Sequence, residues 1–352
     1  MLVGSDSSGS LDRWVRYWGE RRGPQTMLQI VDSHTAGNPT RIVVGGLDLP
    51  ESARTVSHAR AWLRDDADWV RRRLTHEPRG GALTCAVLPI PPTDDSHDLG
   101  AVILEPGSYP PMCGHCMIGL ATVAHELGLA TGNPAGDGGT RYRILTPAGV
   151  VAATVREGPA TVALENVDSY VVDSWPEVLD GREVTCTVLY GGDYYPTIDA
   201  SELGLTLDRS HTDEIVRLAR ELSARVARRA VVDPVTGAAA EVYQVMFHQA
   251  AGSRRSVTAV VAPPGVIDRS PCGTGSSALL ALKVAGGEVG AGEALTTTSI
   301  IGSEFRVHAA GSRTIGGRQV VRPVVVGSAH INGFATVVAD PADALADGFA
   351  PI

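Results

Sequence analysis

Two stretches of this chain repeat one unusual order of residues: proline, then cysteine and glycine, then a run of small apolar residues. Residues 268–278 contain one such unit, with Cys272 directly after a proline, and residues 110–119 contain the other, with Cys113 just after two prolines. Because proline ends a regular element and biases the residue before it towards extended backbone, each unit predicts a tight turn that leads into a buried helix. The duplication predicts two similar lobes, each contributing one thiol to a shared cleft.

A cysteine at a helix N-terminus has chemical consequences. The positive end of the helix dipole favours the thiolate form and so lowers the pKa of the cysteine. The free backbone N–H groups of the first turn, here those of Gly273 and Thr274, can hold an anion such as a carboxylate. The residues therefore predict a reactive thiol beside an anion-binding helix end.

Composition argues against several classes of partner. The chain has 352 residues, a net charge of −9 and only 5% aromatic residues. An acidic chain with no long basic run and few aromatic rings is not expected to bind nucleic acid. A small anionic substrate remains compatible, because local helix dipoles can hold it. The length is sufficient for two domains.

The cysteines do not resemble a disulfide framework, because their number is odd and their spacing is wide. They are Cys85, Cys113, Cys116, Cys186 and Cys272. Cys85 and Cys186 lie in strand-like runs and are expected in the core. The first 26 residues contain several arginines and no long apolar run, so we expect neither a signal peptide nor a membrane span. A reducing cytoplasm is the expected location.

Hydrophobic patterning predicts many short strands around the two cysteine helices. Strands are expected from residue 27 onwards, with helices over residues 56–74 and 209–228. This pattern is typical of an α+β fold in which each lobe curls a sheet around one central helix. We expect an N-terminal extension over residues 1–26, a first lobe over residues 27–178 and a second lobe over residues 179–337.

Two other motifs suggest other functions. The sequence Cys-Gly-His-Cys at residues 113–116 is also the redox motif of disulfide isomerases, which would make the chain a dithiol oxidoreductase. That alternative predicts a thioredoxin-like βαβ unit and usually a tryptophan before the first cysteine, where this chain has Met112. Zinc binding through Cys113, Cys116 and a histidine lacks a second ligand pair at suitable spacing, so no metal is expected.

The sequence gives little indication of a dinucleotide or pyridoxal-phosphate cofactor. Residues 273–278 match the dinucleotide pattern Gly-x-Gly-x-x-Ala, but no apolar strand leads into them. A pyridoxal-phosphate racemase needs a Schiff-base lysine, and Lys283 is the only lysine in the chain. A binding protein without catalytic activity is the remaining alternative.

Four stretches together resemble the proline racemase family, which includes proline racemases, 4-hydroxyproline 2-epimerases and trans-3-hydroxyproline dehydratases. They are Asp32-Ser33-His34-Thr35-Ala36-Gly37, Met112-Cys113-Gly114-His115, Asp268-Arg269-Ser270-Pro271-Cys272-Gly273-Thr274-Gly275 and Ser299-Ile300-Ile301-Gly302-Ser303. The resemblance extends from about residue 27 to the end. It implies two pseudo-symmetric lobes of the diaminopimelate-epimerase type with the active site between them, and a tail at residues 338–352 that returns to the first lobe.

The resemblance also implies roles for individual residues. Cys113 and Cys272 would be the two acid/base thiols of a reaction that needs no cofactor. One thiolate would remove the α-proton of an amino acid from one face while the other thiol returns a proton to the opposite face. The implied substrate-binding residues are Gly114, His115, Gly273 and Thr274 for the carboxylate and Asp268 for the amine.

Three residues bear on the choice among the activities of the family. The dehydratases have threonine in place of Cys272, so this cysteine favours epimerisation. The hydroxyproline epimerases tend to have histidine near Tyr243, which we expect to contact the substrate ring. Cys116 stands where the family more often has glycine, and the sequence indicates no role for it.

We expect a 4-hydroxyproline 2-epimerase that acts on a small amino acid. Its expected assembly is a homodimer. Proline racemase and trans-3-hydroxyproline dehydratase are the alternative activities.

Overall fold

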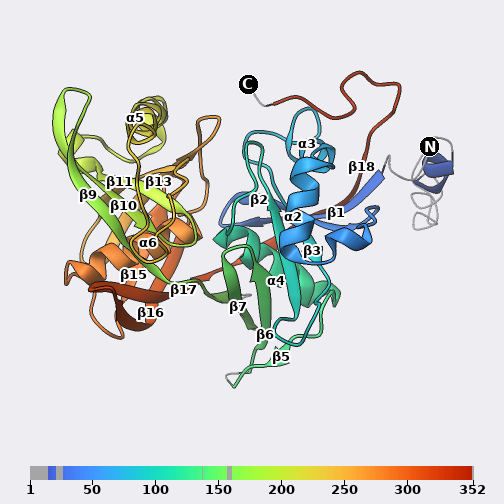
Figure 1. Ribbon diagram of the computed structural model, residues 1–352, viewed down its shortest axis with the longest axis horizontal. Helices are drawn as coiled ribbons and strands as arrows, with labels where there is room; N and C mark the ends of the chain where they lie inside the picture. Colours follow the sequence, from blue (N-terminus) through green and yellow to red (C-terminus); the bar gives the residue numbers. More distant parts are fainter. Residues whose placement is uncertain (1–14, 21–26, 137, 157–160, 351–352) are drawn as a thin grey trace.

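The computed structural model describes residues 15–20, 27–136, 138–156 and 161–350. Figure 1 shows two lobes side by side, each a curled sheet with a helix inside it. Of the N-terminal extension expected over residues 1–26, only residues 15–20 are described, and they are helical. The remainder of that extension lies outside the described residues.

The first lobe is a curled sheet of mixed direction. Its strands are β1 Met27–Thr35, β2 Asn38–Gly45, β3 Cys85–Ile90, β4 Leu99–Leu104, β5 Asn133–Pro134, β6 Thr140–Thr146, β7 Gly149–Arg156 and β8 Thr161–Glu165. The pair β1–β2 is antiparallel, β2–β3 parallel, β3–β4 antiparallel and β4–β6 parallel. The remaining pairs, β6–β7 and β7–β8, are antiparallel, and the short β5 lies against β6.

The second lobe repeats this order of pairings. Its strands are β10 Arg182–Tyr190, β11 Tyr194–Asp199, β12 Val245–Ala250, β13 Arg255–Ala262, β14 Val266–Ile267, β15 Ala294–Ser299, β16 Glu304–Ile315 and β17 Arg318–Gly327. Again β10–β11 is antiparallel, β11–β12 parallel, β12–β13 antiparallel, β13–β15 parallel, and β15–β16–β17 antiparallel. The α+β fold with two similar lobes that the duplicated motif predicted is thus confirmed.

Two strands determine where each lobe begins and ends. β9 (Ser169–Leu179) follows the first lobe in the chain but pairs with β10 and β17 of the second. β18 (Ala329–Val338) follows the second lobe but pairs with β1 of the first. From these pairings we propose a first lobe of residues 27–165 with 329–350, and a second of residues 169–327. The boundaries expected from the sequence, at 178/179 between the lobes and at 337/338 before the tail, both lie later in the chain than these.

Residues beyond β18 stay on the first lobe. The backbone N–H of Phe349 donates to the carbonyl of Glu77 at 2.9 Å. Arg72 donates to the carbonyl of Gly348 at 3.1 Å, and the Arg73 guanidinium lies 2.9 Å from the Asp347 carboxylate. The C-terminal segment is therefore held against α3 (Trp69–Thr75) and the turn that follows it.

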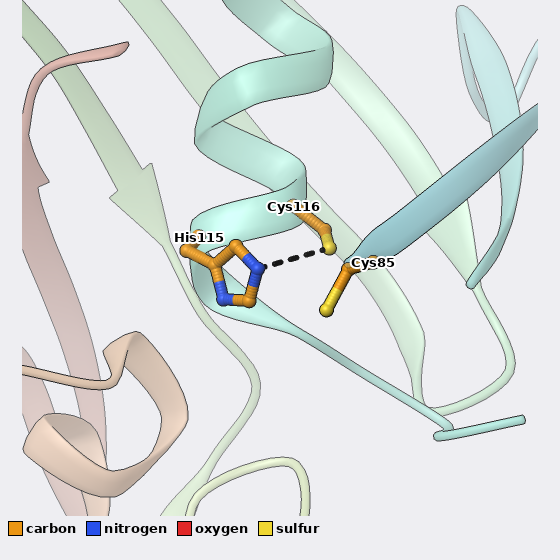
Figure 2. Close-up of side chains that lie close together, drawn as sticks. All are labelled: Cys85, His115 and Cys116. Carbon is orange, nitrogen blue, oxygen red and sulfur yellow. Dashed lines mark hydrogen bonds between the residues drawn. The ribbon is translucent and has the colours of Figure 1, made fainter. Parts of the chain in front are cut away.

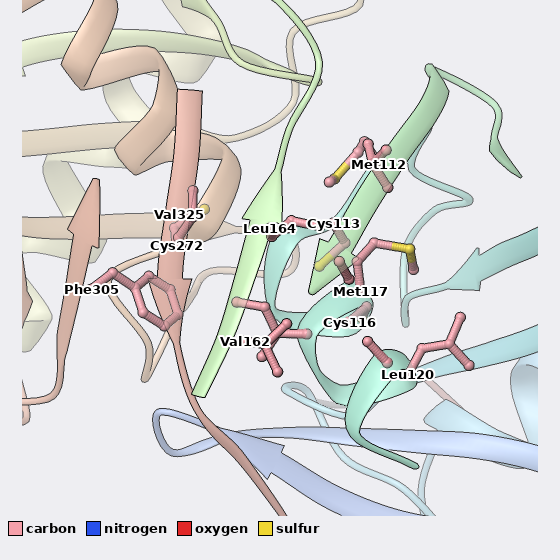
Figure 3. Close-up of a cluster of buried hydrophobic side chains, with 14 of the residues drawn as sticks. Met112, Cys113, Cys116, Met117, Leu120, Val162, Leu164, Cys272, Phe305 and Val325 are labelled. Carbon is pink, nitrogen blue, oxygen red and sulfur yellow. The ribbon is translucent and has the colours of Figure 1, made fainter. Parts of the chain in front are cut away.

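A helix runs through the centre of each lobe. α4 (Gly114–Leu127) is buried from residue 114 to 124, and α6 (Gly273–Ala285) from residue 273 to 281. Both helices are apolar on all sides, and such a helix must be surrounded by other elements. Figure 3 shows the resulting core, in which the start of α4 meets Val162 and Leu164 of β8, with Phe305 and Val325 of the second lobe nearby.

The other helices lie on the outer faces of the sheets. α5 (Thr212–Val226) matches the amphipathic helix expected there, with Ile215, Leu218 and Leu222 buried. The single helix expected over residues 56–74 is two helices, α2 (Val56–Asp65) and α3, because the backbone leaves helical geometry at Asp66. The short 3-10 turns are η2 Glu51–Ala53, η3 Ala200–Leu203 and η4 Arg209–His211. No helix of the described residues is long and apolar enough to cross a membrane.

The N-termini of α4 and α6 meet backbone to backbone. A Cβ added at Gly114 would lie 2.8 Å from the Cα of Gly273, and one added at Gly273 would lie 2.9 Å from the Cα of Gly114. Contacts this short do not occur between real side chains and backbone, so only glycine permits the approach. This pair of glycines therefore brings the two cysteine turns together.

Replacing one of these glycines should force the lobes apart. We expect Gly114→Ala to lower the free energy of unfolding by about 1–3 kcal/mol, because overpacking a contact that cannot relax costs about this much. Thermal and urea denaturation would measure the loss. Gly311→Ala is the matched control, since a Cβ there meets nothing within 4 Å. Equal stability of the two variants would show that the facing helix ends separate freely.

Candidate active site

A pocket lies between the lobes where the two helix N-termini meet. Side chains and backbone of both lobes line it. The first lobe provides Asn38, Ala82, Leu83, Cys85, Glu105, Pro106, Met112, Cys113, Gly114 and His115; the second provides Tyr195, Gln244, Ala262, Pro263, Val266, Asp268, Cys272, Gly273 and Thr274. The free N–H groups of two first helical turns therefore face the same space, which favours an anionic ligand.

Cys113 is the residue immediately before α4, and its thiol lies against His115. The Cys113 Sγ is 3.1 Å from Nδ1 of His115. Nε2 of His115 faces the amide nitrogen of Asn38 at 3.2 Å. In the neutral imidazole, Nε2 accepts from that amide and Nδ1 carries the hydrogen that points at the Cys113 sulfur. Burial lowers the pKa of His115, but the Cys113 and Cys85 thiolates outweigh it and raise that pKa above the ordinary value.

The surroundings of Cys113 favour its thiolate. Hydrogen bonding from the Cys116 thiol lowers the pKa of Cys113 most; burial opposes this effect, and His115 lowers the pKa further, so that it lies well below the ordinary value. The N-terminus of α4 acts in the same direction. The pocket therefore favours a thiolate at Cys113.

Cys272 occupies the corresponding place before α6 in a different environment. Its backbone has φ of 64°, which is unusual for a residue with a side chain. The hydroxyl groups of Tyr195 and Thr274 lie 3.4 Å and 3.5 Å from the Cys272 Sγ, and the N–H of Gly275 donates to that sulfur at 3.4 Å. Burial, together with the charge of Asp268, raises the pKa of Cys272 to about 12. Cys272 is therefore a thiol near neutral pH.

Asp268 forms part of a short network that shapes the turn before Cys272. Its Oδ1 accepts hydrogen bonds from the N–H and the hydroxyl of Ser270 at 2.9 Å and 3.0 Å. The Ser270 hydroxyl in turn accepts from the N–H of Cys272 at 3.1 Å. Burial raises the pKa of the Asp268 carboxyl, which faces the pocket.

Asn38 and Ser303 hold this turn in place from two sides. The side-chain oxygen of Asn38 in the first lobe accepts from the N–H of Arg269 in the second at 3.1 Å. The Ser303 hydroxyl donates to the Arg269 carbonyl at 3.1 Å. Asn38 thus connects His115 to the turn that carries Asp268, and so couples the two halves of the site.

A polar wall lies beside the two thiols. The Gln244 amide donates to Asp193 at 2.7 Å, and burial raises the pKa of Asp193 to about 7. Glu105 is also buried, which raises the pKa of its carboxyl well above the ordinary value. Since Gln244 and Glu105 both line the pocket, it contains hydrogen-bonding groups besides those at the helix ends.

Seven of the eight residues predicted from the sequence line this pocket. They are Cys113, Gly114, His115, Asp268, Cys272, Gly273 and Thr274. Tyr243 is the exception. It lines a neighbouring hollow against α5, where burial and the Asp193 carboxylate raise the pKa of its hydroxyl. Its neighbour Gln244, which donates to Asp193, lines the pocket.

Several pocket residues were not predicted. Glu105, Tyr195 and Gln244 carry no motif, and their positions depend on which strands pair. Asn38 directly follows a stretch that was recognised, so its proximity to the site could have been expected. Cys85, expected in the core, is buried in β3 and also lines the pocket.

The redox alternative required a different local fold. A dithiol oxidoreductase would place Cys113 and Cys116 in a thioredoxin-like βαβ unit. Here they begin the central helix of a curled sheet, and both thiols are free. The dithiol oxidoreductase interpretation is therefore not supported.

Comparison with known proteins identifies relatives along nearly the whole chain. Residues 30–350 match the family described as proline racemase. A 4-hydroxyproline 2-epimerase of Streptosporangium roseum is 34% identical, over 92% of this chain and 98% of the relative. A proline racemase of Acetoanaerobium sticklandii is 32% identical, over 92% and 98%. The crystal structure of a hydroxyproline epimerase from Agrobacterium vitis with bound trans-4-hydroxy-L-proline superposes with a TM-score of 0.82 at 31% identity, over 92% and 95%.

The two helix-start thiols should differ in their reaction with iodoacetamide. Only a thiolate reacts, so Cys113 should be alkylated at about pH 7, roughly tenfold or more faster than Cys272. Because the Cys113 pKa is lowered, its rate should decline only as the pH falls well below neutral, whereas the rate of Cys272 should keep rising towards pH 12. Peptide mass spectrometry would resolve the sites, with the buried Cys186 as an unreactive reference. Equal rates at both thiols would contradict the assigned asymmetry.

Proposed function

The chain belongs to the proline racemase family, and we propose that it is a cofactor-independent epimerase that inverts the α-carbon of a hydroxyproline, with 4-hydroxyproline as the preferred substrate. The observation that carries this proposal is the pair of thiols in one pocket, one favouring thiolate and the other thiol. Named relatives are racemases and epimerases, so the protein is an isomerase.

In the proposed reaction each cysteine handles one face of the α-carbon. The Cys113 thiolate removes the α-proton, and the electron pair of the C–H bond stays on the substrate as a carbanion. The Cys272 thiol then delivers a proton to the opposite face. Product release leaves the two sulfurs with reversed protonation, which is the correct state for turnover in the other direction.

The helix ends would bind and activate the substrate. The N–H groups of Gly114, His115, Gly273 and Thr274 would hold its carboxylate, as hydrogen-bond donors that neutralise charge building up beside the carbanion. The Asp268 carboxylate would contact the amine. A protonated amine acidifies the adjacent α-proton, so this contact would assist the removal of that proton.

The polar wall supports a hydroxylated ring over an unsubstituted one. Gln244 and Glu105 line the pocket and can hydrogen-bond a ring hydroxyl, a contact that the ring of proline cannot make. Proline racemase remains the alternative on family grounds, and its relatives are about as similar. The dehydratase is disfavoured because Cys272 retains a thiol.

Free cysteines suit the reducing cytoplasm that we propose as the location of the protein. The homodimer remains a prediction.

Deuterium exchange distinguishes these substrates. In D₂O we expect α-deuterium to enter trans-4-hydroxy-L-proline faster than L-proline or trans-3-hydroxy-L-proline, as measured by NMR and mass spectrometry.

Cys113→Ser and Cys272→Ser should each lower epimerisation by about 100-fold or more, the usual contribution of a general acid or base. Cys186→Ala, a change at a buried thiol of the second lobe, should retain activity. Absence of exchange into all three substrates would reject the assignment, and full activity of either serine variant would reject the two-base mechanism.

Gln244 should determine the preference for the ring hydroxyl. We expect Gln244→Leu to lower the ratio of kcat/KM for 4-hydroxyproline over proline by about tenfold, because a hydrogen bond to the hydroxyl is lost and no contact to proline replaces it. Gln249→Leu is the matched control: Gln249 donates to the Leu205 carbonyl, away from the pocket. If both variants keep the wild-type ratio, Gln244 does not recognise the ring.

A further inference from the structure

Two cysteines beside the pocket transfer no proton in the proposed reaction. Figure 2 shows Cys85 of β3 pointing towards His115 and Cys116 in the first turn of α4. The two sulfur atoms and one ring nitrogen of His115 all lie within 4.8 Å of one another. All three residues are buried, with exposed fractions of 6% for Cys85, 4% for His115 and 0% for Cys116.

We propose that Cys85, His115 and Cys116 form a binding site for one thiophilic divalent ion, with Zn²⁺ as the natural occupant. Two sulfurs and an imidazole nitrogen are the ligands that zinc prefers in proteins, and three protein ligands with a fourth position left over are typical of accessible zinc sites. The sequence offered no second ligand pair near Cys113 and Cys116. Strand β3 provides the missing ligand from outside the motif.

The separations fit tetrahedral coordination once Nε2 of His115 exchanges the Asn38 amide for the ion. With Zn–S of about 2.3 Å and Zn–N of about 2.0 Å, tetrahedral ligands place sulfur and nitrogen about 3.5 Å apart and two sulfurs about 3.8 Å apart. Nε2 of His115 lies 3.5 Å from the Cys116 sulfur. The 4.8 Å limit on the whole group leaves the Cys85 sulfur at most a short rotation from its place.

Neighbouring groups complete the site. An Oε1 of Glu105 lies 4.0 Å from the Cys85 sulfur, close to the separation of about 3.6 Å expected for sulfur and oxygen on one zinc ion, so Glu105 can take the fourth position. The other ring nitrogen of His115, Nδ1, faces the Cys113 sulfur at 3.1 Å. A ligating histidine normally donates its second N–H to an anionic group, and the Cys113 sulfur provides one.

Charge and access also favour an ion here. Two thiolates offset the two positive charges of Zn²⁺, so the ion stabilises thiolates that burial would otherwise disfavour. Cys85, His115 and Glu105 line the pocket, so an ion can arrive through it. Binding through thiols also releases protons, which makes it measurable without any enzymatic assay.

An ion at this site would inhibit the enzyme, an effect that rests on the proposed function. The ion would lie on the pocket wall, between Glu105 and the histidine that hydrogen-bonds Cys113. It would withdraw Glu105 from the substrate ring and hold His115 and its neighbour Cys113 in one arrangement. Substrate and metal should therefore exclude each other.

Cadmium titration tests the binding site directly. Cd²⁺ bound to thiolates absorbs strongly in the ultraviolet, so titrating the full-length protein, kept reduced by a phosphine, should saturate at one ion per chain. We expect Cys85→Ala and Cys116→Ala each to weaken binding by at least about tenfold and to reduce the absorbance. Cys186→Ala, which removes a buried thiol of the second lobe, should bind as the wild type does. Circular dichroism would verify that each variant is folded.

Two results would overturn the site: no thiolate absorbance in the wild type, or equal binding by all the variants. An activity arm tests inhibition separately. Zn²⁺ should suppress α-deuterium exchange in the wild type at least about tenfold, with recovery on EDTA, and each ligand variant should require at least about tenfold more Zn²⁺ for the same suppression. Undiminished exchange at saturating Zn²⁺ would overturn the inhibition. If no substrate exchanges at all, the proposed function fails, while the cadmium result still decides the metal site.

Discussion

The close approach of two helix N-termini is the contact on which the whole site depends. Gly114 and Gly273 meet backbone to backbone, and no side chain fits between them. Two positive dipole ends repel one another, so this arrangement is stable only because both helices are locked inside curled sheets and because an anion can lie between their N–H groups. β8 of the first lobe pairs with β17 of the second, and β18 returns the chain to β1, so paired strands connect the two lobes and hold the helix ends together.

The two lobes share a backbone arrangement, but the side chains around their two cysteines differ. Cys113 and Cys272 occupy equivalent positions before α4 and α6, but one faces an imidazole and the other faces hydroxyl groups and a buried carboxyl. These neighbours move the two pKa values in opposite directions. Two helix ends with identical surroundings would hold two equal thiols, whereas a base and an acid are needed together for inversion at carbon.

Prediction from sequence succeeded where the information is local. A proline, a cysteine and a glycine before an apolar run specify a turn and a helix start within about ten residues, and both such starts were located. The lobe boundaries and Tyr243 show the limit. β18 pairs with β1 and β9 pairs with β17, which are strands far away in the chain. Whether Gln244 or Tyr243 lines the pocket depends on how their segment packs against the rest of the fold. Neither is visible in a local pattern.

The sequence by itself determined the duplicated architecture and the two cysteines at the helix starts, because the residues that specify a helix start are neighbours in the chain. The tertiary structure alone decided what surrounds those thiols. Asn38, Cys85 and Glu105 reach the pocket only through the pairing of β2, β3 and β4, and Gln244 only through the approach of the second lobe. Contacts between distant segments follow from strand register and packing, and these are properties of the folded chain as a whole.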